Sequence, residues 1–387
     1  MLSKPLRKRL AKRIVESMNM KEDETLRISA GLHTHDLVEN IAIEAMKAGV
    51  QPSFTTTSDD YTKAVYEHVP EKYLGRTSKL GMKMVEALDN TLRIESPKDP
   101  RIMENIPQHK IAAVIQGNRP IRKKMDGYEI KWCYAGFATE EMAAKLGISF
   151  NLLKKFIFDG MLIEPKKLYE PAKIIKKTLA GAKFVHITDE YGTNLTLRMA
   201  NRKIKIADGL IDDDDIRQKD IGLNLPDGEV FTTALETEGG GILVSPKRTD
   251  VLTGKMIENI RLVFEKGKLN LQKTTAEKNE ALLKNTIKHF IAIDKKNEKE
   301  IRTTHFAELG IGLNPLIDRI IGYLLTDEKI GGTIHVAIGM NKDKAYGGAN
   351  SSALHWDFIT HKGVNVEVTY ANGRSAALLE NGKVAVN

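Results

Sequence analysis

Three segments in the second half of the chain concentrate the residue types that do chemistry. Residues 225–241, 305–315 and 327–357 combine carboxylates and histidines with many glycines. Imidazole nitrogens and carboxylate oxygens are ligands that zinc, cobalt, manganese and iron(II) share. The candidate metal ligands in these segments are Glu229, Glu308, Glu328, His335, His355 and Asp357.

The spacing and surroundings of these residues favour a buried site. His355 and Asp357 are two positions apart, so in an extended strand both side chains lie on one face and can reach a single ion. His335 lies in an apolar run, where an imidazole needs a hydrogen-bond partner or a metal. Glu308 is flanked by apolar residues and glycines, a setting in which a carboxylate is costly unless it is paired or coordinating.

Each candidate also has a purely structural interpretation. His335 could be a core histidine with its hydrogen bonds satisfied, and His355 with Asp357 a hydrogen-bonded pair at a strand end. Glu308 could belong to a buried ion pair, and Glu229, after Pro-Asp-Gly, could be a turn residue. The metal hypothesis therefore depends on these residues meeting in the fold, which spacing along the chain cannot establish.

The number of candidate ligands favours two ions over one. A tetrahedral zinc needs only four ligands, and the chain offers five or six. Carboxylates can bridge a pair of ions roughly 3.5–4 Å apart, as they do in aminopeptidases and phosphatases.

The elements that must position these residues change character along the chain. In the first 165 residues, helices are expected at 5–18 and from Asp36 as N-cap to a stop at Gly49. Strands are expected at 26–30, 52–57, 91–94, 111–115 and 130–134. This alternation predicts an α/β domain with a mainly parallel sheet. The absence of a glycine-rich fingerprint after the first strand argues against a dinucleotide site.

From residue 166 onward the pattern is one of paired strands. Tight turns are expected at Tyr191-Gly192, Lys266-Gly267, Asn372-Gly373 and Asn381-Gly382. One helix is expected at 277–291. The division is therefore an N-terminal α/β domain at 1–165 and an antiparallel α+β domain, which carries the candidate metal site, at 166–387.

Composition narrows the classes of partner and location. The chain has 387 residues, 41% hydrophobic and 28% charged, which suits an ordinary two-domain globular protein. Its net charge of +8 is interleaved with acids, so no nucleic-acid partner is expected. The single cysteine, Cys133, excludes an internal disulfide and a cysteine-based metal site. Without an apolar run long enough to span a membrane or a signal-peptide core, a cytoplasmic protein is expected.

Two other polar clusters have simpler interpretations than a metal site. Consecutive acids at 212–215 point in different directions, so a solvated turn is expected there. His33 and His35 have only Asp36 beside them, which indicates a solvated loop.

With these motifs in view, the chain resembles the aminopeptidase T / aminopeptidase S family of dinuclear metallopeptidases. The resemblance is loose in the first 165 residues and tight in the second half. It is carried by Leu-Pro-Asp-Gly-Glu-Val-Phe-Thr at 225–232, by Ala-Glu-Leu-Gly-Ile-Gly-Leu-Asn at 307–314, and by the two histidine segments around His335 and His355.

The resemblance implies a role for each matching residue. Glu229 matches the first metal-binding glutamate, Glu308 the glutamate that bridges the ions, and His335 the histidine that follows. His355 and Asp357 match the final pair of ligands. Glu236 matches a further family glutamate, to which a proton-shuttling role between water and leaving amine is assigned.

Two departures from the family pattern stand out. Glu328 is the candidate for another ligand, although two extra residues separate it from His335. The family's active-site tyrosine falls at Lys342, and the nearest tyrosine is Tyr346, which could hydrogen-bond a tetrahedral oxyanion.

The function implied is removal of the first residue from short peptides by a water that two divalent ions activate, with zinc, cobalt or manganese as the metal. The resemblance also implies a homodimer whose active sites face an enclosed cavity. The alternative enzyme is a ring-cleaving iron(II) dioxygenase of the dihydroxypyridine type, with His335, His355 and Asp357 as its triad. A non-catalytic binding protein is disfavoured because basic residues and aromatics are not interleaved.

Overall fold

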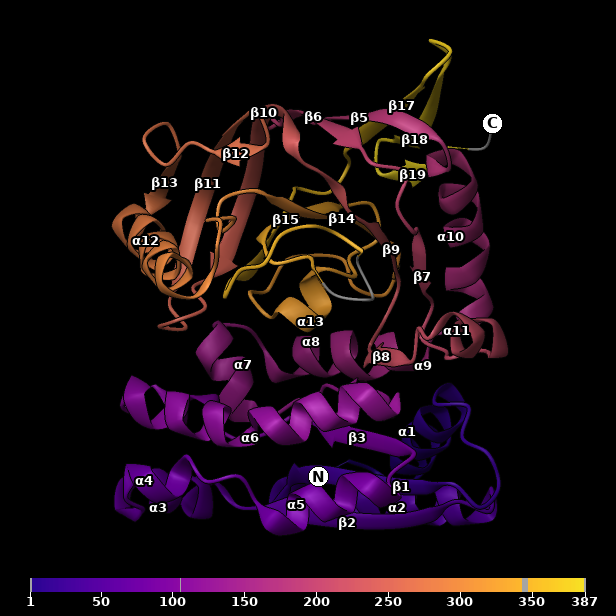
Figure 1. Ribbon diagram of the computed structural model, residues 1–387. Helices are drawn as coiled ribbons and strands as arrows, with labels where there is room; N and C mark the ends of the chain where they lie inside the picture. Colours follow the sequence, from indigo (N-terminus) through magenta and orange to yellow (C-terminus); the bar gives the residue numbers. More distant parts are fainter. Residues whose placement is uncertain (1, 105, 343–346, 386–387) are drawn as a thin grey trace. The chain divides into compact units, whose positions relative to one another are not determined.

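The protein is described by a computed structural model that covers residues 2–104, 106–342 and 347–385 (Figure 1). The chain forms two compact units: Met1–Leu162 with Gly209–Pro226, and Ile163–Asp208 with Asp227–Asn387. The first has an all-parallel sheet with helices and the second has antiparallel sheets, which confirms the predicted fold class. None of the helices in the described part of the chain is long and apolar enough to cross a membrane.

The first unit is built on a five-stranded parallel sheet with the order β2-β1-β3-β4-β8. The strands expected at 26–30, 52–57, 91–94 and 130–134 are confirmed. The fifth strand comes from the segment that returns to this unit after residue 208. The bounds are β1 Thr25–Gly31, β2 Gln51–Thr57, β3 Asn90–Ile94, β4 Lys131–Ala135 and β8 Gly222–Leu225.

The opening helix of the first unit buries its apolar face. In α1 (Lys4–Ser17), Leu10 and Ile14 are buried, and α1 packs on α2 (His35–Lys47), which in turn contacts β1 and β2. The other helices of this unit are η1 Leu32–Thr34, α3 Asp59–His68, α4 Glu71–Leu74, α5 Lys79–Met84, η2 Val85–Ala87, η3 Pro100–Met103, α6 Gln108–Tyr128, α7 Glu140–Leu146, α8 Phe150–Lys154, η4 Lys155–Asp159, α9 Gly160–Leu162 and α11 Asp213–Gln218.

The strand expected at 111–115 is wrong, because these residues lie inside helix α6. A short apolar run does not distinguish a strand from a buried helix turn. Here the helix continues through Gly117 and Pro120, two residues that ordinarily indicate a turn, so the run is part of a long helix.

Two local expectations about acids also need correction. The N-cap of α2 is Thr34 rather than Asp36, which lies in the first turn of the helix, where a negative charge is favourable. The acids at 212–215 do not form a simple solvated turn. Asp212 caps α11 by accepting from the backbone N–H of Asp215, whose side chain accepts from the Asp212 N–H in return.

The second unit contains two antiparallel sheets. The larger has the order β12-β11-β10-β6-β5-β17-β18-β19, with β13 paired to β11, and the smaller has the order β16-β15-β14-β9-β7. All four predicted turns, such as Asn372-Gly373, connect neighbouring strands. The bounds in the larger sheet are β5 Ala182–Thr188, β6 Asn194–Met199, β10 Ala234–Thr249, β11 Met256–Glu265, β12 Lys268–Leu269, β13 Thr275–Lys278, β17 Asn365–Tyr370, β18 Ser375–Glu380 and β19 Lys383–Val384.

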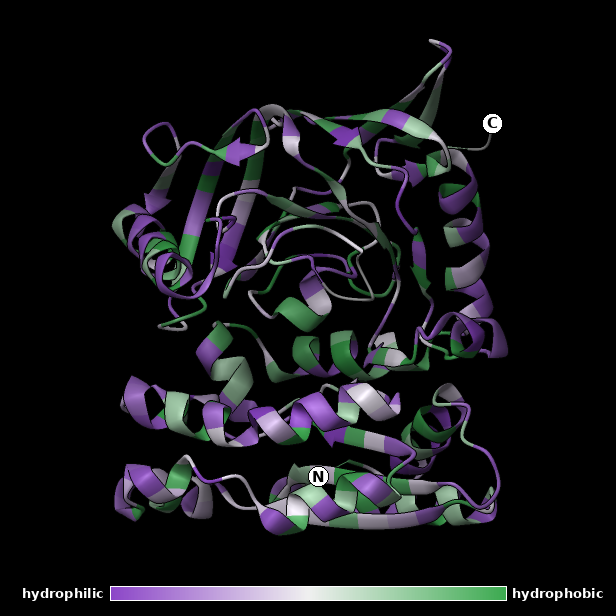
Figure 2. Ribbon diagram, viewed as in Figure 1, coloured by the Kyte–Doolittle hydropathy of each residue, from purple (hydrophilic) through white to green (hydrophobic). Residues whose placement is uncertain are grey.

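The smaller sheet lies in the apolar core of this unit. Every residue of β14 (Phe306–Gly312) and β15 (Ile334–Gly339) is buried. The core is shared with the larger sheet and with α10 (Pro165–Leu179), whose alternating purple and green in Figure 2 shows its one apolar face. Polar side chains on β14 and β15 are therefore held in a poorly solvated setting. The remaining elements are β7 Lys205–Ala207, β9 Glu229–Thr232, α12 Glu280–Asn297, α13 Leu324–Asp327 and β16 His355–Ile359.

A buried aspartate on α12 holds the segment that leads into β16. The helix expected at 277–291 is present as α12, and its Asp294 is fully buried. The Asp294 carboxylate accepts from the backbone N–H of Ala353 at 2.8 Å and from the hydroxyl of Ser352 at 2.6 Å, and Thr303 donates to it as well. These bonds fix the chain just before His355.

We expect Asp294→Ala to lower the free energy of unfolding by about 3 kcal/mol, because it strips a buried acceptor from three donors. Ser352→Ala, which removes one donor and leaves the carboxylate its other partners, should cost about 1 kcal/mol or less. Urea denaturation followed by circular dichroism measures both. Equal losses in the two variants would contradict a special anchoring role for Asp294.

Candidate metal centre

Five of the six predicted ligands, all except Glu328, come from strands of the smaller sheet. Cross-strand register places His355 opposite Gly339 and Asp357 opposite Ala337 on β15. It also places Gly310 of β14 opposite His335. Directly opposed residues share a face, so the two histidines and Asp357 project to the same side. Glu229 joins them from β9, where it is opposite Gly312.

Small residues leave room for the polar side chains on this face. A Cβ at Gly310 would lie 1.9 Å from the Nε2 atom of His335, far inside van der Waals contact. Glycine at this position therefore lets the imidazole lie across β14. Steric exclusion by the His335 ring therefore explains why a glycine follows Glu308 at position 310.

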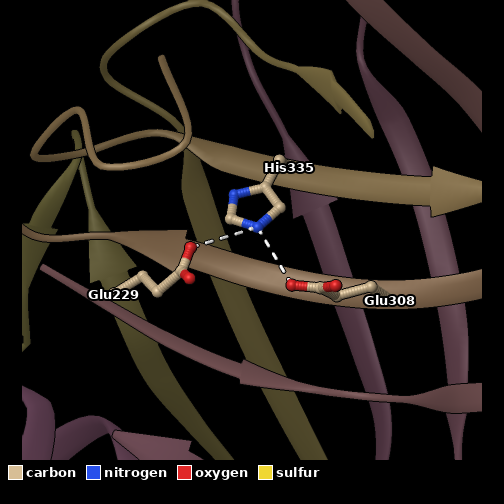
Figure 3. Close-up of side chains that lie close together, drawn as sticks. All are labelled: Glu229, Glu308 and His335. Atoms are coloured by element: carbon tan, nitrogen blue, oxygen red, sulfur yellow. Dashed lines mark hydrogen bonds and ion pairs between the residues drawn. The ribbon is translucent and has the colours of Figure 1, made fainter. Parts of the chain in front are cut away.

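Glu229, Glu308 and His335 form the first potential ligand group (Figure 3). The Nε2 atom of His335 lies 3.3 Å from Oε1 of Glu308 and 3.4 Å from Oε2 of Glu229. All three side chains are buried. The register of β14 shifts between Phe306 and Leu309, so Glu308 lies within an irregular stretch of the strand, a common means of re-aiming a side chain.

Glu308, His355 and Asp357 form the second group. Here the Nε2 atom of His355 lies 3.3 Å from Oε2 of Glu308 and 3.4 Å from Oδ1 of Asp357. Glu308 thus directs one oxygen to each group. A carboxylate shared in this way is suited to bridge two ions.

The geometry of both groups fits divalent ions. Ligand atoms that are each about 2.0–2.2 Å from one ion lie about 3.0–3.5 Å from one another. The four nitrogen–oxygen separations in the two groups, 3.3 and 3.4 Å, fall in this range. Oε2 of Glu229 and Oδ1 of Asp357 are buried and accept no hydrogen bond from any described residue. Two buried carboxylate oxygens that lack hydrogen-bond donors in the described chain are well suited to metal ligation.

His355 is oriented by the backbone. Its Nδ1 atom lies 2.7 Å from the carbonyl oxygen of Met340, which accepts the Nδ1 proton. Because the Nδ1 proton is held by the backbone, Nε2 is the ring nitrogen available to a metal, which is the usual support for a histidine ligand.

The two groups are strongly coupled electrostatically. Burial opposes charge on Glu308, but hydrogen bonds with His335 and His355 hold the pKa of its carboxyl well below the usual value. Burial alone would lower the pKa of His335, but the hydrogen bond with Glu308 and the charge of Glu229 raise it to about 9. In the metal-free protein the histidines therefore neutralise the carboxylates by holding protons that an ion would displace.

Glu328 lies next to these groups and belongs to neither of them. It follows α13, and its Oε2 atom is 3.5 Å from the ammonium nitrogen of Lys329. Burial and the charges of Asp357 and Glu229 raise the pKa of Glu328 to about 8. Its assignment as a metal ligand stays a prediction.

The two predicted catalytic residues are placed differently. Glu236 is outside both groups, where Arg202 forms a two-pronged ion pair with it at 2.5 and 2.9 Å. Asn341 and the backbone N–H of Ala349 also donate to Glu236. Burial opposes its ionisation, but these donors lower its pKa to about 2. Tyr346 lies outside the described residues, and Lys342, at the family's tyrosine position, is exposed.

Two buried cationic residues beside the site, Lys329 and Arg248, were not predicted from the sequence. Lys329 is fully buried and contacts Glu229 at 2.5 Å. Arg248 on β10 is buried close enough to Asp357 to lower its pKa, and its Nε atom has no hydrogen-bond partner among the described residues. The available signal was weak: Lys329 follows two acids, Asp327 and Glu328, and charged neighbours of that kind are commonly solvated.

Two carboxylate–histidine groups that share a glutamate, buried on an antiparallel sheet, are arranged so that they could hold metal ions. The chain belongs to the M29 family of thermophilic metalloproteases, whose family model matches residues 4–384. It is therefore a metal-dependent peptidase, as the resemblance of its motifs implied. No curated protein sequence matches the chain significantly.

Two solved structures share the whole fold. Wild-type AmpT from Thermus thermophilus is similar with a TM-score of 0.77 and 17% identity, over 99% of this chain and 100% of that one. The 2,5-dihydroxypyridine dioxygenase from Pseudomonas putida KT2440 is similar with a TM-score of 0.62 and 13% identity, over 100% of this chain and 99% of that one. At these identities the likeness concerns the fold.

Metal uptake should release protons at neutral pH. With its pKa at about 9, His335 is protonated at pH 7 in the metal-free protein, and a metal ligand must be neutral. Calorimetric titration of the metal-free protein in buffers of different ionisation enthalpy should show about one proton or more released per chain at pH 7. Release should decline, and apparent affinity rise, as the pH approaches 9. A heat that is independent of the buffer would contradict this protonation state.

Gly310→Ala should weaken metal binding without unfolding the protein. The added Cβ would collide with His335 and displace its ring from the first group. A shift of one ligand should reduce affinity about 10–100-fold, the range seen when the support of a ligand is lost. Gly127→Ala, in helix α6 at a site where a Cβ meets nothing within 4 Å, tests for nonspecific effects of added bulk. Equal affinities in wild type and Gly310→Ala would refute the steric role.

Proposed function

We propose that the protein is an aminopeptidase that removes the first residue of short peptides with two divalent ions. The observation that carries this proposal is the sharing of Glu308 between two ligand groups, each with a histidine and a second carboxylate. Membership of the M29 metalloprotease family supports the peptidase activity. The likeness to AmpT supports the fold in which the site is set.

The chain's own residues would hold and orient the catalytic ions. Glu229 and His335 would serve one ion, His355 and Asp357 the other, and Glu308 both. Bound ions would supply Lewis-acid polarisation of the scissile carbonyl and would make a water acidic enough to react near neutral pH. The backbone carbonyl of Met340 would keep His355 in the tautomer that binds metal. Glu328 is proposed as a further ligand once an ion offsets its repulsion from the other acids.

The proposed roles of Glu236 and Tyr346 rest on the family pattern. A carboxylate with a pKa of about 2 and several donors is a weak proton acceptor at neutral pH. The contacts of Glu236 instead support a positioning role. It receives hydrogen bonds from Asn341 and Ala349, which flank the segment containing Tyr346. The proton-shuttle assignment for Glu236 and the oxyanion role of Tyr346 stay predictions.

An iron(II) dioxygenase is the second candidate function, because this chain shares its fold with the 2,5-dihydroxypyridine dioxygenase. A mononuclear triad would use His335, His355 and Asp357 and would give no metal role to Glu229 or Glu308. Both glutamates contribute to the ligand groups, and Glu308 contributes to each. This arrangement favours the two-ion peptidase.

Several finer features belong to the same proposal. Zinc, cobalt and manganese all accept this set of ligands, so the native metal is left open among them. The homodimer and enclosed cavity that the resemblance implies, and the cytoplasmic location expected from composition, stay predictions.

The decisive experiment compares hydrolysis of leucine anilide and short peptides before and after EDTA, and again after zinc, cobalt or manganese is restored. We expect one N-terminal residue to be removed at a time, activity to be lost with chelation, and activity to return with metal. N-acetylated copies of the same peptides should not be cleaved. Inactivity with every metal, together with one iron per chain and turnover of a dihydroxypyridine, would establish the alternative.

Glu308→Gln should lose both metal binding and hydrolysis. Loss of a bridging carboxylate that costs about 4 kcal/mol of transition-state stabilisation reduces kcat/KM roughly 10³-fold. Glu367→Gln, the same change at an exposed position on β17, serves as the matched control and should keep both properties. A Glu308→Gln protein that retained its metal and its activity would exclude the proposed bridging role.

A further inference from the structure

Lys329 is a fully buried ammonium group set against the metal ligands. Its Nζ atom lies 2.5 Å from Oε1 of Glu229, 3.5 Å from Oε2 of Glu328 and 3.8 Å from Oδ1 of Asp227. The residue has no exposed surface. Each of its ion-pair partners among the described residues is a buried or largely buried carboxylate. A lysine in this setting carries a permanent positive charge into the acidic centre.

This charge falls unequally on the two ligand groups. Glu229 belongs only to the first group, and it divides its oxygens between Lys329, at Oε1, and His335, at Oε2. In the second group, His355 forms ion pairs with Glu308 and Asp357. Arg248 influences Asp357 through space but makes no ion pair with a described residue.

An ion entering the first group must therefore share the charge of Glu229 with a cation that cannot leave. Two positive charges a few ångströms apart in a buried site repel strongly, because little water screens them. Asp227 offsets part of this repulsion, since its Oδ1 atom lies 3.8 Å from the ammonium nitrogen and the residue belongs to neither group. Within the described residues, neither Glu308 nor Asp357 forms an ion pair with a lysine or an arginine.

We propose that Lys329 is a built-in cation that makes the two ion positions unequal. The group of Glu308, His355 and Asp357 fills first and tightly, and the group of Glu229, Glu308 and His335 fills second and more weakly. The proposal rests on the two-ion site of the proposed function, but it concerns affinity and order of filling and not the reaction. Lys329 thus acts on the metals through Glu229, as a positioning residue.

The test is stepwise metal binding to the full chain, measured without any peptide. Metal-free protein is titrated with cobalt(II) in a calorimeter and by visible absorption, which reports the ligands of each ion as it binds. Wild type should show two steps that differ in affinity by about tenfold or more. Lys329→Met should strengthen the weak step by about tenfold or more and change the tight step by less than about threefold. Lys329→Arg keeps the charge and should keep the steps unequal.

A second variant works in the opposite direction and does not remove the lysine. Asp227→Asn leaves the ammonium without its offsetting carboxylate, so the weak step should weaken further, by about threefold or more. Circular dichroism establishes that each variant is folded. If Lys329→Met does not fold, the response of Asp227→Asn and the separation of the wild-type steps decide the matter.

The outcomes separate this proposal from the proposed function. Two equal steps in wild type, or a weak step that Lys329→Met leaves unchanged or abolishes, would overturn it. One ion in wild type and two in Lys329→Met would support it in its strongest form, and one ion in both would overturn it. Unequal steps that respond as expected in a protein without peptidase activity would uphold the lysine's role while the aminopeptidase proposal fails.

Discussion

The concentration of negative charge on one buried sheet is the constraint on which the rest of the second unit depends. Glu229, Glu308 and Asp357 are each less than a tenth exposed, on strands that are packed among apolar residues. Burying carboxylates together is unfavourable unless cations accompany them. In the metal-free chain that compensation comes from protonated histidines and from Lys329. The site is therefore built to receive further positive charge, which divalent ions supply.

The sheet holds the charged side chains close together because hydrogen bonds between its strands fix the backbone positions from which they project. The ligands come from β9, β14, β15 and β16, which are hydrogen-bonded to one another in register. Gly310 leaves space for the ring of His335, where a Cβ would collide with it. Asp294 fixes the segment before β16, and Glu236 with Arg202 fixes the segments around Asn341. Polar anchors outside the two groups thus define the geometry inside them.

The same fold supports different chemistry in its relatives, so function must be argued from the site. A metallopeptidase family and a dioxygenase both share the architecture of this chain. What separates the two readings here is a pair of glutamates. Glu229 and Glu308 enlarge a histidine and aspartate triad into two groups with a common member. A mononuclear iron site has no need of a bridging carboxylate.

The sequence by itself determined the local features of this protein. Period-two spacing put His355 and Asp357 on one face, Asn-Gly pairs predicted turns, and glycines around Glu308 marked a buried carboxylate. These are short-range effects of backbone geometry and burial, which a few neighbouring residues encode. Residues 111–115 were predicted as a strand and form part of a helix, because a short apolar run is compatible with a strand or with a helix.

Tertiary structure alone decided which distant residues meet. The return of residues 209–226 to the first unit, the ion pair of Arg202 with Glu236, and the contact of Lys329 with Glu229 join residues 34 to 100 positions apart or more. Such contacts depend on the register and order of strands, and no local pattern specifies them. A buried lysine such as Lys329 looks like any solvated lysine until its tertiary partners are known, because carboxylates distant in sequence, Asp227 and Glu229, compensate its charge.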